Sequence, residues 1–152
     1  MTKCLILACL FLPLLGLVTG CSEHDVSKTQ EVTFDQLLAG PGQFAGKSIS
    51  IEGFYFQGFE VVVLSEKLEQ SGYAPGHLAP KGTMIWIEGG IPGEVYDRLY
   101  QQQMMGPLER YGRVRVVGRF EYGGEYGHLG AYISQIAPSE VELLLWSPSA
   151  RQ

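Results

Sequence analysis

The chain has 152 residues, enough for one domain, and a formal net charge of −5 at pH 7. Hydrophobic residues make up 45% of it, which excludes an intrinsically disordered chain, and the excess of acids disfavours binding to a nucleic-acid backbone. Its 20 glycines are about twice the usual share of ~7%, without a collagen repeat.

The first 20 residues predict an export signal. Lys3 gives a positive start, and an almost unbroken apolar run follows from Cys4 to Val18. A spanning helix needs about 20 apolar residues, so this run is too short to cross a membrane. The charged start, the apolar middle and the small-residue exit are typical of a signal peptide, which we assign to residues 1–20.

The exit sequence Val18–Thr19–Gly20–Cys21 resembles the lipobox of bacterial lipoproteins, in which an aliphatic, a small polar and a small residue precede a cysteine. The resemblance implies cleavage before Cys21 and a diacylglyceryl group on its thiol, and more than one acyl chain anchors a protein stably. By analogy with enteric bacteria, Ser22 in place of aspartate implies the periplasm-facing outer membrane rather than the inner membrane. The alternative is an ordinary secretory signal followed by a chance cysteine.

The cysteines agree with an exported lipoprotein. Cys4 and Cys9 lie in the predicted signal, so Cys21 is the single cysteine that remains and no internal disulfide can form. An acylated Cys21 leaves no thiol for catalysis or zinc binding. We expect residues 21–31, which are mainly polar, to be a flexible tether, residues 32–146 to fold, and residues 147–152 to be a C-terminal tail.

The folded part begins with a predicted short helix capped by Thr33, with Phe34, Leu37 and Leu38 on its apolar face. Gly40–Pro41–Gly42 is expected to end it. Alternating apolar residues and turn signals then predict five strands and one longer helix. The strands are expected at residues 48–57, 59–65, 83–88, 113–121 and 131–137, and the helix at 92–105.

Between these elements the sequence predicts loops and breaks. Residues 66–82 contain two prolines and several glycines and are expected to be a loop with one helical turn at 66–70. Gly53 predicts a bend in the first long strand. Pro138 is expected to end the fifth strand, and the apolar segment 141–146 remains unassigned.

The predicted order strand–strand–strand–helix–strand–strand resembles the OB-fold, a small five-stranded Greek-key barrel with a helix between strands three and four. Two strands also open alike, with a turn glycine, a cation, β-branched residues and a second glycine, at 46–53 and 112–118. The resemblance covers residues 33–137 and is nearest to OB-like domains of bacterial envelope lipoproteins. It implies an all-β class with one or two short helices. The alternative is another small, partly open barrel or roll.

A glycine-rich hairpin at residues 122–132 is the first candidate binding site. Its aromatic rings offer stacking surfaces, its histidine can exchange a proton, and its glycines allow close approach. The side chains concerned are those of Tyr122, Glu125, Tyr126, His128 and Tyr132. We expect a lip for a sugar, a peptide or another envelope protein. The alternative is a barrel corner without a ligand.

Phe54 and Phe56 are the second candidate. Both face away from the isoleucines of their strand. They are expected either to pack beneath Phe34 or Trp146, or to form an exposed apolar patch for a partner.

The sequence predicts no metal site and no cofactor. His24, His77 and His128 lack the spacing of zinc ligands, and no G-x-S-x-G, H-E-x-x-H or Walker motif is present. The acidic charge and the envelope address argue against nucleic acid, although four arginines form a stripe at residues 110–119. We expect Glu52 and Glu60 to balance that stripe.

Together these features favour a lipid-anchored envelope protein with a non-enzymatic binding role, whose partners are the membrane and either an envelope protein or a small ligand. One alternative is an enzyme, or enzyme accessory, that acts on envelope glycans through Glu121, Glu125 and His128. Another is an immunity or inhibitor lipoprotein.

Overall fold

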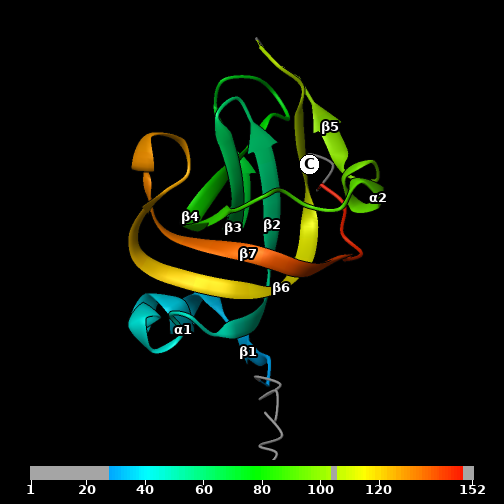
Figure 1. Ribbon diagram of the computed structural model, residues 1–152. Coiled ribbons are helices and arrows are strands. Elements are labelled where there is room, and N and C mark those ends of the chain that lie inside the picture. The colour runs from blue at the N-terminus through cyan, green and yellow to red at the C-terminus, as the bar shows by residue number, and fades with distance from the viewer. Residues whose placement is uncertain (1–27, 104–105, 149–152) are drawn as a thin grey trace, which may run out of the picture.

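The computed structural model describes residues 28–103 and 106–148, which are mostly β-structure with two short α-helices (Figure 1). The predicted signal peptide, Cys21, most of the tether and the end of the tail lie outside the described residues. The strands are β1 (Gln30–Val32), β2 (Ser48–Gly58), β3 (Val61–Gln70), β4 (Leu78–Ile87), β5 (Tyr100–Gln102), β6 (Glu109–Tyr126) and β7 (Tyr132–Leu143). The α-helices are α1 (Phe34–Ala39) and α2 (Gly93–Tyr96), and the 3-10 turns are η1 (Pro41–Gln43) and η2 (His128–Gly130).

Helix α1 begins where the sequence predicts it. The Thr33 hydroxyl accepts a hydrogen bond from the Gln36 N–H at 3.3 Å, and the Gln36 side chain accepts one from the Thr33 N–H at 2.8 Å. This capping box satisfies two N–H groups that a helix start leaves free. Phe34 and Leu37 are buried as expected, whereas Leu38 is exposed.

The strands form one sheet, and five of them close into a ring. The order is β1-β2-β3-β4-β7-β6-β5, and β2 pairs with β6 as well as with β3. Strands β2, β3, β4, β7 and β6 therefore surround a common interior (Figure 1). The ring is antiparallel except between β4 and β7, which run parallel.

Strand β6 connects the two sides of this ring. It pairs with β2 along residues 110–119 and with β7 from residue 114 onward, and it curves around the base of the ring in Figure 1. The β6–β7 register shifts by one residue at Gly118, which lies opposite Pro138. Such bulges bend a strand, and here the bend lets β6 close the ring.

The interior of the ring holds the main hydrophobic core. Ile49, Ile51 and Tyr55 alternate inward along β2, as the sequence pattern predicts. A second cluster, centred on Phe56 and Val63, packs on the opposite face of these strands, because neighbouring residues of a strand alternate between its two faces. Gly53 leaves no room for a side chain, because a Cβ there would lie 2.9 Å from both the Phe34 ring and the Ser65 carbonyl oxygen. Gly53 therefore lets α1 sit directly on β2.

The predicted loop at 66–82 is wrong, because strands occupy much of it. Strand β3 continues to Gln70 and β4 begins at Leu78, with Leu68 opposite Pro80. The prolines and glycines of this segment indicated a loop. However, β7 covers β4 only at Trp86 and Ile87, so Pro80 lies on an open edge where its missing N–H is tolerated.

The predicted helix at 92–105 is also wrong in length, since α2 ends at Tyr96 and residues 100–102 form β5. Tyr100 stacks on Tyr111 of β6 with ring centroids 5.8 Å apart, and its hydroxyl donates to the Trp146 carbonyl oxygen at 2.9 Å. These contacts to distant parts of the chain override a helical pattern.

The sequence predicts that Pro138 ends the last strand, and this prediction is wrong. Strand β7 passes through it to Leu143 and takes up the first part of the unassigned segment 141–146. The proline sits at the bulge opposite Gly118, where an antiparallel ladder can accommodate it. Gln30 and Glu31, expected in the tether, are part of β1 and pair with β2.

Candidate binding surface at two joined loops

The glycine-rich hairpin lies at the turn between β6 and β7. Tyr126 and Tyr132 form its last cross-strand pair, and η2 makes the connection. Gly127, with φ of 71°, sits so close to Trp86 that a Cβ would lie 2.6 Å from the indole ring. The turn therefore depends on glycine both for its backbone conformation and for its packing on β4.

Two of the hairpin tyrosines pack against other residues of the protein. The Tyr132 ring packs on Trp86 with centroids 5.4 Å apart, and burial raises the pKa of the Tyr132 hydroxyl above its ordinary value. Tyr126 is half-buried and folds back over Gly124, where a Cβ would lie 2.5 Å from its ring. These two rings hold the hairpin in shape and offer little free surface.

The tip of the hairpin contacts a second loop, at residues that the sequence pattern predicts to be the start of a strand. His128 Nε2 lies 3.3 Å from the Glu60 carboxylate in the two-residue turn between β2 and β3. Beside this pair, Phe59 is 68% exposed and Leu129 is 91% exposed. We call these four residues the joined-loop surface.

Backbone strain coincides with this surface. Among the described residues, Glu60 (φ 60°) and Leu129 (φ 52°) are the non-glycine residues with positive φ. The left-handed region costs a non-glycine residue about 1 kcal/mol or more, and such strain concentrates at functional sites. Both strained residues belong to the two loops that the His128–Glu60 contact joins.

Tyr122 lies apart from this surface, beside α1. It lines a groove of about 180 Å³ together with Leu37, Leu38, Met84 and Ile133. The groove is mainly apolar and open at its edge. It is smaller than the ~300–1,000 Å³ typical of small-molecule sites.

The two candidate phenylalanines of β2 are covered. Trp146 packs edge-on against Phe54 with ring centroids 5.1 Å apart, which is one of the two arrangements expected from the sequence. Phe56 is buried beside Val63 and Tyr111. Neither ring contributes an open apolar patch.

The carboxylates and histidine proposed for glycan chemistry have separate partners. Glu121 accepts a hydrogen bond from the Gln135 amide at 2.8 Å, and Glu125 packs beside Gly130. His128 is engaged with Glu60. No set of three or more His, Cys, Asp or Glu side chains with metal-binding geometry occurs in residues 28–103 and 106–148.

Three of the four arginines of the stripe on β6 pair with acids, whereas Arg110 donates to the Tyr96 carbonyl oxygen at 3.0 Å. Glu52 of β2 accepts from Arg113 at 3.0 Å and from Arg115 at 2.7 Å, and Arg115 also donates to Glu142 of β7 at 2.6 Å. Glu60, the other expected partner of the stripe, contacts His128 instead. The hydrogen bond from Arg115 is the main cause that holds the pKa of Glu52 below its ordinary value of 4.5.

Replacing Glu52 with glutamine is expected to lower the free energy of unfolding at pH 7 by at most about 1 kcal/mol, because exposed ion pairs contribute little. The pKa of Glu52 is lower in the folded state than in the unfolded chain. Its stabilisation is therefore complete above pH 4.5 and is lost as the pH falls through the folded-state pKa. Urea unfolding at pH 7 and at descending pH should show the difference between the two proteins shrinking.

The exposed glutamate Glu69 on β3 supplies the control. Glu69→Gln should leave the stability at pH 7 nearly unchanged. A Glu52→Gln effect that grows on acidification would contradict the assigned pairing.

Comparison with protein-family models, with curated proteins and with solved structures finds no match to this chain. Among the described residues, none of the helices has the length and apolar character needed to cross a membrane.

The sequence predicts the hairpin as a candidate site, but its pattern places Phe59 and Glu60 in a strand rather than in a turn. The available signal was the spacing of Gly58 and Val61, which pair across a two-residue turn. A two-residue turn between Gly58 and Val61 places Phe59 in the turn rather than in a strand.

Proposed function

We propose that this chain is a lipid-anchored bacterial envelope protein that binds a partner protein through the joined-loop surface. The observation that carries the proposal is the contact between two loops far apart in sequence, each with a strained backbone and an exposed apolar tip. Scattered apolar residues on a surface are ordinary. Here the exposed apolar residues lie on two loops that contact each other, and this favours a recognition site.

We propose an OB-like barrel as the finer description of the ring. The strand order β2-β3-β4-β7-β6, the parallel β4–β7 pair and the position of α2 between β4 and β6 support it. OB barrels use the loops between their first and second and between their fourth and fifth strands for ligands. The joined loops occupy these two positions.

A protein partner fits this surface better than a small ligand. Small molecules bind in concave sites that surround them, whereas Phe59 and Leu129 protrude. Exposed apolar anchors become the centre of protein interfaces once a partner covers them. The pairing of Arg113 and Arg115 with acids also disfavours a nucleic acid, because a phosphate would have to displace Glu52 or Glu142.

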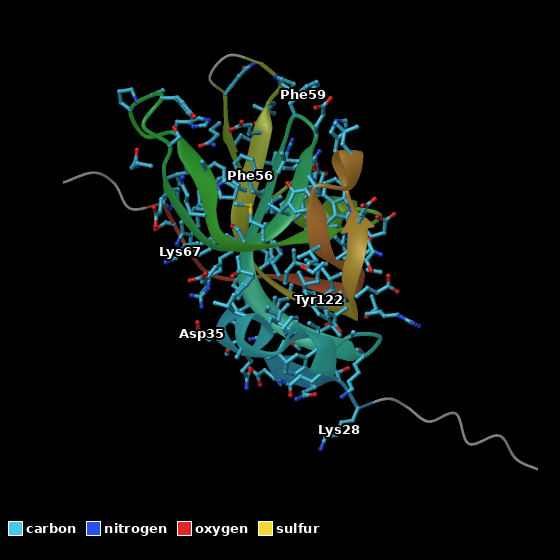
Figure 2. The ribbon with its side chains drawn as sticks, turned by 90° about the vertical axis from the view of Figure 1, so that its left-hand side faces the viewer. Lys28, Asp35, Phe56, Phe59, Lys67 and Tyr122 are labelled. Atoms are coloured by element: carbon cyan, nitrogen blue, oxygen red, sulfur yellow. The ribbon has the colours of Figure 1, made fainter. Side chains whose placement is uncertain are left out.

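Lys28, which is the described residue nearest to the proposed anchor, and the joined-loop surface lie at opposite ends of the described residues. Figure 2 shows Phe59 at the top and Lys28, the first described residue, at the bottom. A lipid on Cys21 would therefore hold the domain from below and leave the joined loops facing away from the membrane. This arrangement favours a partner in the periplasm or on another envelope layer.

A photo-crosslinking amino acid in place of Phe59, in cells that make the full-length protein, tests the binding site. We expect one discrete adduct with a partner protein. Adding Leu129→Ser should reduce that adduct at least about tenfold, because an interface anchor contributes roughly 1.4 kcal/mol or more. Adduct yield is measured by immunoblotting and the partner is identified by mass spectrometry.

Matched controls come from other exposed positions. Tyr73 is 80% exposed in the loop between β3 and β4, and a crosslinker there should give no such adduct. Leu145→Ser, at another fully exposed leucine, should leave the Phe59 adduct intact. Equal adducts from both crosslinker positions would refute this surface as the binding site.

Cys21→Ser tests the anchor. We expect the acyl mass to disappear and the protein to leave the membrane fraction or to remain unprocessed, because the thiol that accepts the diacylglyceryl group is gone. Mass spectrometry and membrane fractionation measure both effects. Cys9→Ser, within the proposed signal peptide, should change neither, and an unchanged membrane fraction for Cys21→Ser would exclude lipid anchoring.

A further inference from the structure

A second group of polar side chains lies at the end of the sheet where β3 and β4 are joined, outside the joined-loop surface. The Ser71 hydroxyl lies 2.8 Å from His77 Nδ1, and His77 Nε2 lies 2.8 Å from the Glu109 carboxylate. The three residues come from the β3–β4 connection and the start of β6. They form a continuous chain of hydroxyl, imidazole and carboxylate.

Hydrogen bonding sets the direction of this chain. In the tautomer whose Nε2–H donates to the Glu109 carboxylate, Nδ1 is left with a lone pair that accepts from the Ser71 hydroxyl. Serine hydrolases have the same order of groups, with the two ring nitrogens exchanged. Either nitrogen can act as the base when the other donates to a carboxylate.

The carboxylate is held in place by a further residue. The Gln102 amide of β5 donates to Glu109 at 2.7 Å and also makes two hydrogen bonds to the Leu78 backbone, as acceptor at 3.0 Å and as donor at 2.6 Å. The His77 side chain is only 9% exposed. The base and its carboxylate are therefore rigidly positioned, which is what preorganised catalysis requires.

The serine remains open to a substrate. Ser71 is half-buried, and a Cβ on Gly72 beside it would meet no atom within 4 Å. The Tyr73 N–H donates to the Ser71 hydroxyl oxygen at 3.1 Å and helps to orient the hydroxyl. The proposed base His77 lines a cavity of about 270 Å³, together with the small residues Ala74, Pro75 and Gly76 and the amide side chains of Gln102 and Gln103.

We infer that Ser71, His77 and Glu109 form an acyl-transfer centre that hydrolyses short-chain carboxylic esters. The small volume of the cavity beside His77 favours short acyl groups. Esters are favoured over amides because an alkoxide is the easier group to expel. This activity is independent of the proposed binding surface and of the lipid anchor.

The reaction proceeds in two balanced steps. Ser71 Oγ bonds to the ester carbonyl carbon while its proton passes to His77 Nδ1, and the carbonyl electron pair moves to the oxygen. Collapse breaks the bond to the alcohol, which leaves with that proton, and an acyl-serine remains. Water then repeats the sequence and releases the carboxylic acid and free Ser71. Glu109 stays ionised and acts as a positioning residue that stabilises the imidazolium.

A fluorophosphonate probe tests the nucleophile, because it reacts with a serine whose proton a base removes. We expect intact-mass and peptide analysis of the folded full-length protein to show one adduct, on Ser71. Ser71→Ala should abolish it, whereas Ser139→Ala, at an exposed serine on β7, should retain it. Absence of label on Ser71 in folded protein would overturn the inference.

Hydrolysis of p-nitrophenyl acetate gives the second measurement. Ser71→Ala and His77→Ala should each lower the rate at least about 100-fold, the usual contribution of a general base. Circular dichroism must show that both variants are folded. If Ser71→Ala is folded and hydrolyses the ester as fast as the parent protein, the inference fails. Ser71, His77 and Glu109 then only stabilise the β3–β4 connection.

The positioning role of Glu109 is tested by the tautomer of the His77 ring, which a merely structural role of Glu109 would leave unchanged. The ¹⁵N spectrum of the His77 ring should show a protonated Nε2 in the parent protein. In Glu109→Gln the His77 ring should populate both tautomers, because the glutamine amide can donate to Nε2 as well as accept from it. The rate of ester hydrolysis should fall in the same variant. An unchanged tautomer with a lowered rate would remove Glu109 from the proposed centre.

Discussion

Replacing Gly118 with alanine is expected to lower the free energy of unfolding by about 3 kcal/mol. The added Cβ would overlap the Ala137 carbonyl oxygen and lie 2.9 Å from its carbonyl carbon and 3.0 Å from the Ile136 side chain. Most of these atoms belong to the β7 backbone, so they cannot move without opening the β6–β7 pairing. Urea unfolding followed by circular dichroism measures the loss.

Gly93→Ala is the matched control for this change. Gly93 opens α2, and a Cβ there would meet no atom within 4 Å. Its effect should stay within about 0.5 kcal/mol. If the two alanine variants are equally stable, the close approach of β6 and β7 at Gly118 is wrong.

Replacing Phe120 with alanine is expected to cost about 3–5 kcal/mol, a large part of the stability of a domain of this size. Phe120 is 1% exposed and belongs to the main core. Its N–H donates to the Lys47 carbonyl oxygen at 2.9 Å, and its own carbonyl oxygen accepts from the Gly46 N–H at 2.8 Å. The backbone is held by Gly46 and Lys47 on one side and by its pairing with Ile136 of β7 on the other, so the cavity left by the ring cannot collapse.

Phe59→Ala removes the same side chain from an exposed position and should change stability by less than about 0.5 kcal/mol. Chemical denaturation of both variants gives the comparison. A Phe120→Ala protein as stable as Phe59→Ala would place Phe120 outside the core. The same measurement shows that any loss of crosslinking around Phe59 comes from binding rather than from unfolding.

Local sequence patterns predicted the parts of the fold that local physics determines. Thr33 and Gln36 form a cap within one helical turn, and Ile49 and Ile51 alternate because one face of β2 is buried. The errors fall where distant contacts decide. Tyr100 joins a strand because it meets Tyr111 and Trp146, and a short window of sequence contains neither partner.

The candidate sites follow the same division. The hairpin was visible from its glycines and tyrosines, but its contact with Glu60 depends on ring closure. His77 was set aside because it lacks a second histidine at metal-ligand spacing. Its partners are a serine and a glutamate that only the topology brings to it. Rules on the sequence spacing of metal ligands recognise ligands that lie on one helix, strand or loop. They do not recognise a site whose side chains come from several such elements.

The parallel pairing of β1 with β2 has a mechanical consequence. Tension between the proposed lipid anchor and a partner on the joined loops would enter at β1 and run lengthwise along β2 to its turn. Residues 30–32 of β1 pair in parallel with residues 49–51 of β2, so this load would shear the β1–β2 hydrogen bonds together. Pulling from the opposite terminus would peel β7 from β6 a few bonds at a time. The proposed lipid anchor would thus load the β1–β2 pairing in shear rather than by peeling.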